Sequence, residues 1–359
     1  FPTRRSSDLM LSGGIDSTTV AALAREHASV RAFTMAVPDG PGEDESETVR
    51  ATTAALGIPL EVVPIDSATY RRAIATVTAR VGRPGFHVRN AAFEVGFDAI
   101  LARSGAAGLD RMLDGTSANL AVGTPGGRAA ALRWLLPLAR LLEPLRLDGV
   151  LSRLLLDRAG LPSAVPELAT SLPRGARLLD GGARARIAAR AWAAAAHLRA
   201  PYERALRATA LADLRIWVPR FLERAAILGP QHGVSVASPY HDARVLAFGL
   251  NLPLHALRRG RGPDKRLLHE LARRHLPRLR PHRVTVPWTA PLSRLVDPLA
   301  GIILVGDGFV ADHLRLDADA LAAEIAAARR VPGELGKLVQ LEIWGRVCCL
   351  GEDPRALGE

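Results

Sequence analysis

The chain has 359 residues, of which 48% are hydrophobic and 23% are charged, so it can bury a sizeable core. No run of about eighteen apolar residues occurs, because Arg133 and Arg140 interrupt the best candidate, residues 129–142. The formal net charge is +11, but only 4% of the residues are aromatic and the arginines are scattered. We therefore expect a soluble globular protein with no membrane partner, and the composition disfavours nucleic acid as a partner.

Cysteine occurs only at Cys348 and Cys349, which are adjacent and cannot form a framework of disulfides. No signal-peptide pattern precedes the first predicted strand. These two features favour a cytoplasmic location. An apolar helix is predicted over 338–350, and we expect both cysteines to be core residues of that helix rather than redox-active groups.

The first informative stretch of the chain is 9–20. A short apolar run stops at Ser12-Gly13-Gly14, and an alanine-rich helical pattern follows to about Ala28. This pattern predicts a strand, a glycine turn and a helix. Two glycines let the backbone approach a ligand closely, and the start of a helix presents unpaired N–H groups and a positive dipole end to an anion.

Polar side chains surround this turn. Ser12, Ser17 and Thr18 add hydroxyl donors, while Asp16 supplies a carboxylate that can hold a magnesium ion against phosphates. A simple capped turn between a strand and a helix is the alternative interpretation of the same residues. The chain lacks the Gly-Lys-Ser/Thr ending of a Walker loop at this point, which disfavours transfer of a γ-phosphate.

Strands and helices alternate in the residues that follow, with strands predicted over 30–37, 60–65 and 111–114 and helices over 43–56 and 90–104. This alternation indicates a parallel, doubly wound sheet, which binds ligands at the carboxyl ends of its strands. The turn at Ser12 and the strand end near Met35 both lie at that edge.

The second half of the chain is mainly helical. Residues 128–228 are rich in alanine and leucine, and a helix over 243–252 follows the stretch 238–242. Lys265, one of only two lysines, begins a helix that runs to about His275. The compact ammonium group of lysine suits a phosphate whose charge changes during a reaction, although spacing alone favours an ordinary surface lysine.

Three blocks of sequence resemble one known family. The string LSGGIDS, at 11–17, resembles the pyrophosphate-binding SGGxDS loop of the AMP-forming ATP pyrophosphatases and is most similar to the synthetase domain of asparagine synthetase. Two segments within 238–277, SPYHDARVLAFGLNLP and PDKRLLHELARRHLP, resemble the family's PFLD segment and its lysine segment, and 44–46 resembles its DES element. The resemblance spans about residues 10–350. It implies an α/β fold of the adenine nucleotide alpha hydrolase-like type with a large helical lobe.

The resemblance also implies a substrate, ATP, and a cofactor, Mg²⁺. The residues that it places at the nucleotide are Leu11, Ser12, Gly13, Gly14, Ile15, Asp16, Ser17, Thr18, Met35, Asp114 and Gly115. Within this set the turn would hold pyrophosphate, Asp16 would bind magnesium, and Leu11, Met35 and Gly115 would lie along the adenosine. Lys265 matches the lysine that stabilises charge as the adenylate forms and breaks down.

One block departs from the family pattern. The family has a G-E/x-G-x-D-E string where this chain has Gly115-Thr116-Ser117-Ala118-Asn119. Thr116 cannot act as a carboxylate, and Asn119 can reach a metal only through a neutral carbonyl. The loss of these negative charges predicts weaker magnesium binding and makes asparagine less certain as the product.

The family's reaction is the formation of an acyl-adenylate from a carboxylate and ATP, followed by transfer of the acyl group to an amine. Aspartate and ammonia are the substrates in asparagine synthetase, whereas the related β-lactam synthetases and lasso-peptide cyclases use an internal amine. We therefore expect an AMP-forming amide ligase whose partner is a small-molecule or peptide carboxylate. The alternative to an active enzyme is a nucleotide-binding protein with impaired catalysis. The neutral residues Thr116 and Asn119, where the family has acidic ones, suggest this alternative.

The expected organisation follows from the same resemblance. Residues 1–9, FPTRRSSDL, resemble the translation of a sequencing adapter, so we expect them to be an artefact. A nucleotide-binding core is expected over 10–127, a helical lobe over 128–230 and the rest of the synthetase domain over 231–350. The family's glutaminase domain uses an N-terminal cysteine as its nucleophile, whereas both cysteines of this chain lie near residue 350. We therefore expect a missing or separate glutaminase domain to be the ammonia source.

Overall fold

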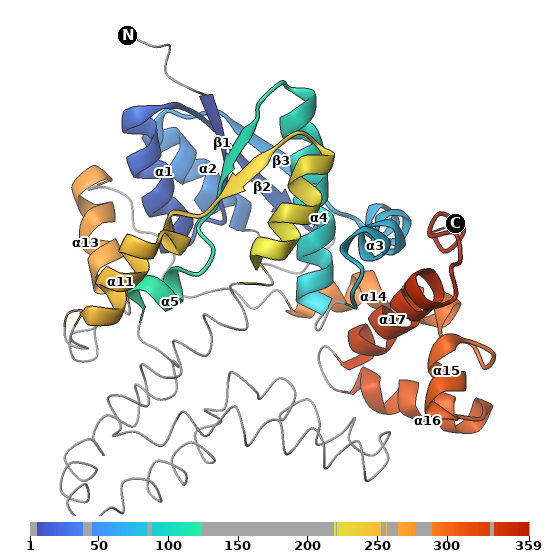
Figure 1. Ribbon diagram of the computed structural model, residues 1–359. Coiled ribbons are helices and arrows are strands. Elements are labelled where there is room, and N and C mark those ends of the chain that lie inside the picture. Colours follow the sequence, from blue (N-terminus) through green and yellow to red (C-terminus); the bar gives the residue numbers. More distant parts are fainter. Residues whose placement is uncertain are drawn as a thin grey trace, which may run out of the picture. The chain divides into compact units, whose positions relative to one another are not determined.

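The structure is a computed structural model that describes most of the α/β part of the chain (Figure 1). The described residues are 6–38, 45–84, 88–123, 219, 221–252, 256, 265–276, 289–330 and 334–358. The helical lobe predicted over 128–230 lies almost entirely outside them. The chain divides into two compact units, the first comprising Phe1–Gly115, Glu223–Ala237 and Leu271–Glu359 and the second comprising Thr116–Leu222 and Ser238–Glu270.

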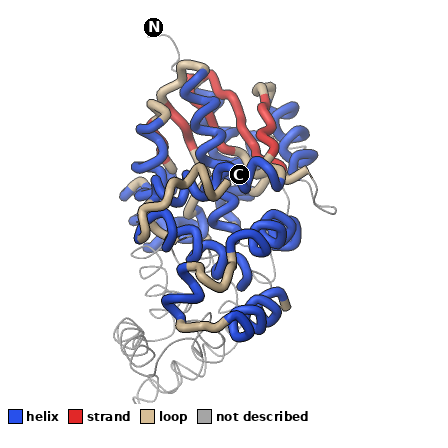
Figure 2. The backbone as a smooth tube through the Cα atoms, turned by 90° about the vertical axis from the view of Figure 1, so that its right-hand side faces the viewer, coloured by secondary structure: helices blue, strands red, loops and turns tan. Residues whose placement is uncertain are grey.

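The first unit contains a five-stranded sheet in the order β3-β2-β1-β4-β5. Its strands are β1 (Ser6–Met10), β2 (Ser29–Ala36), β3 (Leu60–Pro64), β4 (Arg111–Leu113) and β5 (Ser235–Ala237). Every pairing in the sheet is parallel, and helices lie on either side of the strands (Figure 2). The prediction of a doubly wound α/β fold is therefore confirmed. β1 begins inside the segment that resembles an adapter.

Alternate strand residues face two helical layers, as the pleat of a strand requires. Met10, Phe33 and Met112 belong to one buried core, and α4 (Val88–Ala106) packs on the same sheet. The other helices that pack against β2 are α1 (Ile15–His27) and α2 (Glu45–Leu56). Fully burying a side chain such as Phe33, which is 0% exposed, stabilises the fold by about 1.5–3 kcal/mol.

Several elements of the first unit were not predicted, and one helix and one strand among them show why. Helix α3 (Ser67–Val81) begins where the Asp66 Oδ1 atom accepts a hydrogen bond of 2.7 Å from the backbone N–H of Thr69, and it ends at Gly82 with φ of +72°. Both are ordinary cap signals that the sequence carries. Strand β5 has only three residues, Ser-Val-Ala, which is too short for periodicity to reveal it.

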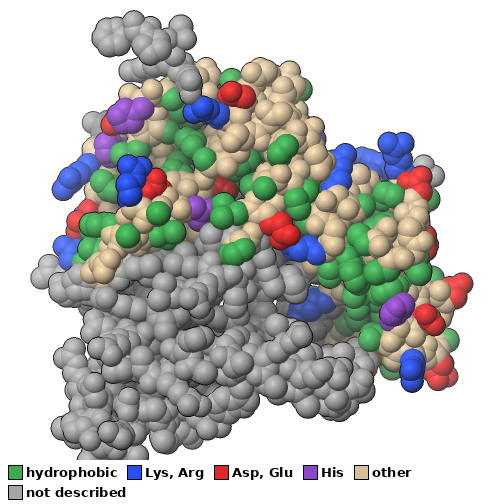
Figure 3. All heavy atoms as spheres, in the orientation of Figure 1, with side chains coloured by type: hydrophobic (Ala, Val, Ile, Leu, Met, Phe, Trp, Pro, Cys, Tyr) green, Lys and Arg blue, Asp and Glu red, His purple; other side chains and the backbone are tan. Residues whose placement is uncertain are grey.

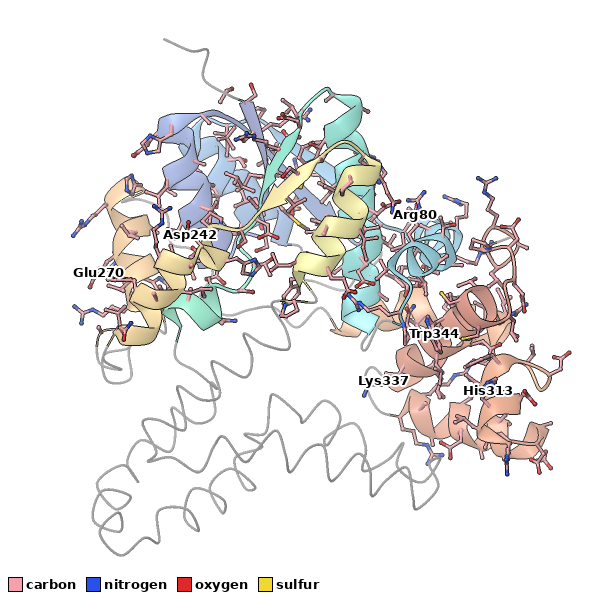
Figure 4. All side chains as sticks on the ribbon, in the orientation of Figure 1. Arg80, Asp242, Glu270, His313, Lys337 and Trp344 are labelled. Carbon is pink, nitrogen blue, oxygen red and sulfur yellow. The ribbon has the colours of Figure 1, made fainter. Side chains whose placement is uncertain are left out.

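The described residues of the first unit also form the helices α14 (Thr289–Ile303), α15 (Phe309–Leu314), α16 (Ala318–Arg329) and α17 (Glu334–Trp344). The fully buried Glu342 on α17 accepts hydrogen bonds from the backbone N–H groups of Phe309, at 2.9 Å, and Val310, at 2.7 Å. This carboxylate therefore satisfies the unpaired N–H groups at the start of α15. Trp344, labelled in Figure 4, donates from its indole nitrogen to the Gly82 carbonyl at 3.1 Å.

The expectation for the two cysteines is wrong. The helix predicted over 338–350 is α only to Trp344, and a π-helical turn, Gly345–Cys349, follows it. The wider π turn changes the angle between successive residues and moves both cysteines off the apolar face. Cys348 and Cys349 are exposed free thiols.

The described part of the second unit is small and helical. It contains α5 (Ala118–Val122), the 3₁₀ turn Pro239–His241 and α11 (Ala243–Asn251), and α13 (Arg266–His275) begins in it. Gly249 on α11 lies against the Ala121 carbonyl, where a side chain has no room. Among the described residues, no helix is long and apolar enough to cross a bilayer. Acidic and basic side chains are interspersed on the described part of the face in Figure 3.

Candidate nucleotide site

The turn after β1 combines extension of the sheet with a sharp reversal. The Leu11 N–H donates to the Phe33 carbonyl at 2.8 Å, so the β1–β2 ladder continues one residue beyond the strand. Gly13 then adopts φ of +71°, a left-handed conformation that favours glycine. A Cβ atom at Gly13 would lie 3.2 Å from the Thr48 methyl carbon on α2, so the turn also packs closely on that helix. Both the predicted turn and its need for glycine are present.

Hydroxyl groups fill the inside of this turn. The Ser17 Oγ atom accepts a hydrogen bond of 3.1 Å from the Ser12 N–H and lies 3.2 Å from the Ser12 Oγ. It also donates to the Gly14 carbonyl at 3.4 Å. Thr18 is 0% exposed, and its hydroxyl has no hydrogen-bond partner among the described residues. A buried hydroxyl without a hydrogen-bond partner costs free energy.

The helix that follows adds charge to the turn. Gly14 is the N-cap of the 13-residue α1 and supplies no side-chain cap, so the first N–H groups of Ile15 and its successors remain directed toward the turn. Asp16 lies in the first turn of α1 and is half-buried. A helix start with free N–H groups attracts anions, whereas the Asp16 carboxylate attracts a cation. Together they suit a phosphate chain that carries a metal ion.

The end of β4 lies against this turn. A Cβ atom on Gly115 would lie only 2.7 Å from the Ser17 backbone nitrogen and 2.8 Å from its Cα atom. The preceding residue, Asp114, is 7% exposed and donates from its backbone N–H to the Ala237 carbonyl at 3.1 Å. The structure therefore brings Asp114 and Gly115 to the turn, and only glycine fits at residue 115.

Met35 lies near the end of β2, at the same edge of the sheet. Its sulfur atom is packed against Gly96 on α4, at the place a Cβ atom would occupy. Met35 is half-buried, whereas Leu11 is 1% exposed. Met35 belongs to β2, and Leu11 lies one residue beyond β1, the neighbouring strand.

Apart from Gly115, the block that departs from the family pattern lies in the second unit. The Ser238 hydroxyl donates to the Thr116 carbonyl at 2.8 Å, a role that the sequence did not reveal. Ser117 adopts φ of +70°, which is strained for a residue with a side chain. Asn119 is exposed. The replaced positions are therefore held in a defined backbone conformation.

Lys265 also lies in the second unit. It precedes α13, and its carbonyl accepts a hydrogen bond of 3.1 Å from the His269 N–H. Its φ of +56° is a left-handed value that is uncommon outside glycine. Strain of this kind is found disproportionately at functional sites. In the same unit Asp242 caps α11 by accepting from the Arg244 N–H at 2.8 Å, and hydrogen bonds from Arg244 lower the pKa of the Asp242 carboxyl to about 2.

These features define an α/β nucleotide-binding protein with a glycine turn, lined by hydroxyls, at the carboxyl edge of its sheet. The family model for asparagine synthase matches residues 5–303. The chain belongs to the asparagine synthase family, whose synthetases use ATP to form amides. A search of the curated proteins finds no match to the chain.

Proposed function

We propose that the chain is an AMP-forming amide ligase that activates a carboxylate with ATP. The observation that carries the proposal is the turn at 12–18, where the hydroxyls of Ser12 and Ser17 lie beside the start of α1. Such donors suit the charge on a departing pyrophosphate, because they are aligned before the reaction begins.

The proposed reaction has two steps. A carboxylate oxygen attacks the α-phosphorus of ATP, and the bond from that phosphorus to the bridging oxygen breaks, so that pyrophosphate leaves. An amine then attacks the acyl carbon and loses a proton, and AMP leaves with the oxygen that linked it. In this proposal Ser12, Ser17 and Thr18 hold pyrophosphate, Gly115 lets the nucleotide approach the turn, and Lys265 stabilises charge on the α-phosphate.

Magnesium is proposed at Asp16. No group of three or more His, Cys, Asp or Glu residues within the described ranges could hold a metal by itself. Mg²⁺ commonly binds through one or two carboxylates together with phosphate oxygens, so a half-buried aspartate at the turn fits it. The ion would neutralise phosphate charge, and Asp16 would hold it at the start of α1.

Aspartate with ammonia is the first substrate pair to consider, and ammonia would come from a separate or missing glutaminase domain. An internal amine, as in cyclases of β-lactams or lasso peptides, is the alternative within this class. The neutral side chains of Thr116 and Asn119 favour a carboxylate other than aspartate. They also motivate a second candidate function, nucleotide binding without turnover.

The test is pyrophosphate release from ATP and Mg²⁺ with aspartate and ammonia. We expect Asp16→Ala and Lys265→Ala to lower release by about a hundredfold or more. Two matched controls lie in the first unit: Asp319, the second residue of α16 as Asp16 is of α1, and Lys337, the other lysine of the chain. Asp319→Ala and Lys337→Ala should release pyrophosphate at the unaltered rate.

Each result decides between the candidates. Release that needs aspartate and is lost in the two site variants alone would establish the aspartate ligase. Release only with a peptide or another carboxylate would favour a cyclase or a different amide. ATP binding without release, whatever carboxylate is supplied, would overturn the ligase and leave the nucleotide-binding protein.

A further inference from the structure

A group of buried charges lies on the α4 side of the sheet, within the first unit. We call Arg83, Glu94, Asp114 and Arg224 the buried cluster. Glu94 and Arg224 are each 4% exposed and Asp114 is 7% exposed. Charged side chains are rarely buried to this extent, because removing a charge from water is costly. The burial of these charges therefore needs an explanation, and the proposed roles of the turn residues do not provide one.

The contacts of the cluster fix the two arginines. Arg83 Nη2 lies 3.2 Å from Glu94 Oε1, and its Nε lies 3.6 Å from the exposed Glu223. The Arg224 guanidinium carbon lies 4.4 Å from the centre of the Phe93 ring and 4.8 Å from that of Phe97. Two aromatic faces therefore hold Arg224 in one orientation.

Strand and helix geometry directs Arg224 and Asp114 toward each other. Asp114 follows Met112 by two residues, so both side chains lie on the same face of β4. Leu228 follows Arg224 by four residues in the helical stretch 221–231, so both lie on one face of it. Met112 and Leu228 belong to the same buried core, so the faces that carry Asp114 and Arg224 both border that core.

Electrostatics agree with this placement. Burial lowers the pKa of Arg224 to about 10, while the charges of Glu94 and Asp114 oppose that change. The guanidinium is therefore still charged at neutral pH. Burial also raises the pKa of the Glu94 carboxyl, against the charges of Arg83 and Arg224. Interactions between these groups are strong because little water screens them.

The cluster is continuous with the nucleotide site through the backbone. Asp114 is bonded to Gly115, and Gly115 touches the Ser17 backbone with no room for a Cβ atom. The Asp114 N–H is held by the Ala237 carbonyl at 3.1 Å. A force on the Asp114 side chain is therefore transmitted to the turn that carries the pyrophosphate donors.

We propose that Arg224 is a positioning residue of the nucleotide site: it holds Asp114, and through Asp114 it presses Gly115 against Ser17. This inference rests on the proposed use of the turn as a nucleotide site. Arg224 touches no substrate in this role. It fixes the spacing between the end of β4 and the start of α1, which sets the distance between the donors of the turn and a bound phosphate chain.

The test compares Arg224→Met with Arg80→Met. Methionine keeps the length and the contact with Phe93 and Phe97 but removes the charge. Arg80 is the matched control, because it reaches the same helix and pairs with Asp98 at 3.2 Å, but its side chain is 38% exposed. The readouts are hydrogen exchange of the Ser17 amide, the dissociation constant for ATP with Mg²⁺, and the free energy of unfolding in urea.

We expect Arg224→Met to speed exchange of the Ser17 amide about tenfold and to weaken ATP binding by a similar factor. It should also lower the free energy of unfolding, because the charges of Glu94 and Asp114 stay buried without it. Arg80→Met should leave exchange and binding unchanged. Arg224→Lys, which keeps the charge, should recover part of the loss. Asp114→Asn should produce the same exchange effect, and adding it to Arg224→Met should change nothing further.

Unchanged Ser17 exchange in Arg224→Met would overturn the positioning role. Additive effects of Asp114→Asn and Arg224→Met would also overturn it, because the two residues would then act separately. The exchange measurement needs no ligand, so it decides this inference even if the chain releases no pyrophosphate. Lack of pyrophosphate release would count against the proposed ligase alone.

Discussion

Helix α4 carries two groups of charges that are built from the same parts. In each group a carboxylate on α4 pairs with an arginine near the end of α3 and interacts with the charge of a residue from 221–233. The buried cluster uses Glu94, Arg83 and Arg224. The surface cluster, one turn further along α4, consists of Asp98, Arg80 and His232, with Asp98 3.2 Å from Arg80 and 2.8 Å from His232. Figure 4 labels Arg80 beside α3 and α4.

The two clusters differ in burial and in their position along the sheet. In the surface cluster the side chains of Arg80, Asp98 and His232 are 38%, 16% and 17% exposed. In the buried cluster the Glu94 side chain is 6% exposed and Arg224 is 4% exposed, and only Arg83, at 20%, reaches the surface. The buried cluster includes Asp114, which follows the carboxyl end of β4, whereas His232 lies before the start of β5. Burial makes an ion pair rigid at a cost in stability, so a buried pair is understandable where rigidity serves a ligand.

The strongest test of this difference removes both charges of each cluster. We expect Glu94→Gln with Arg224→Met to raise the free energy of unfolding by about 1–4 kcal/mol, because two desolvated charges disappear. The same variant should bind ATP more weakly. Urea unfolding and a binding titration measure the two effects. The matched pair, Asp98→Asn with Arg80→Met, should change stability by less than about 1 kcal/mol and leave binding intact; a large stability loss in the buried pair would refute the comparison.

Gly115→Ala tests the contact through which the buried cluster reaches the turn. The new methyl carbon would lie 2.7 Å from the Ser17 nitrogen, so we expect a stability loss of about 1–3 kcal/mol and loss of ATP binding. Gly301→Ala is the control, because a Cβ atom there meets no atom within 4 Å and the residue lies inside α14. That variant should be about 0.5–1 kcal/mol more stable and bind normally. Normal ATP binding by Gly115→Ala would contradict the close contact.

The buried cluster should also give the protein a pH dependence. Burial raises the pKa of the Glu94 carboxyl above its ordinary value of 4.5. Below pH 4.5 the carboxyl is protonated in both the folded and the unfolded chain, so its burial does not lower the free energy of unfolding there. As the pH rises through the raised pKa, the folded state resists ionisation and loses stability. In urea unfolding from pH 4 to 8, the free energy of unfolding of Glu94→Gln should increase relative to that of the unaltered protein as the pH rises. The same pH dependence in both proteins would exclude the raised pKa of Glu94.

The smallest effect is expected in the surface cluster. Arg80→Ala should lower the free energy of unfolding by only about 0.2–1 kcal/mol, because the pair is partly solvated. Added salt at about 1 M should remove most of that difference by screening. A thermal or urea unfolding series in low and high salt measures it. A loss that persists in high salt would mean that this cluster is as shielded as the buried one.

The local parts of the nucleotide site could be predicted from the sequence. The string LSGGIDS carries strand, turn and helix within a dozen residues, and the turn and α1 appear where they were expected. Gly115 was predicted from the resemblance, and the structure supplies its reason in the contact with Ser17. Short-range sequence patterns predict a site where its backbone geometry and its side-chain chemistry both come from residues close together in the chain.

The buried cluster could not be predicted in this way. Glu94, Asp114 and Arg224 come from separate elements, and a single arginine does not stand out in a chain where Lys and Arg total 47. Burial alone distinguishes Arg224 from the rest, and burial depends on how α4, β4 and the stretch 221–231 pack. The prediction for Cys348 and Cys349 was wrong for a similar reason, because no sequence pattern indicates the π turn in which they are exposed.

The order of the strands has a consequence for the making of the protein. β4 is the inner neighbour of β5, but the whole of Thr116–Leu222 separates them in the chain. Ribosomes add about 5–20 residues per second, so the edge of β4 waits on the order of ten seconds for its partner. During synthesis the nascent sheet therefore presents an open edge that β5 later covers, and a chaperone that binds extended segments has its opportunity in that interval.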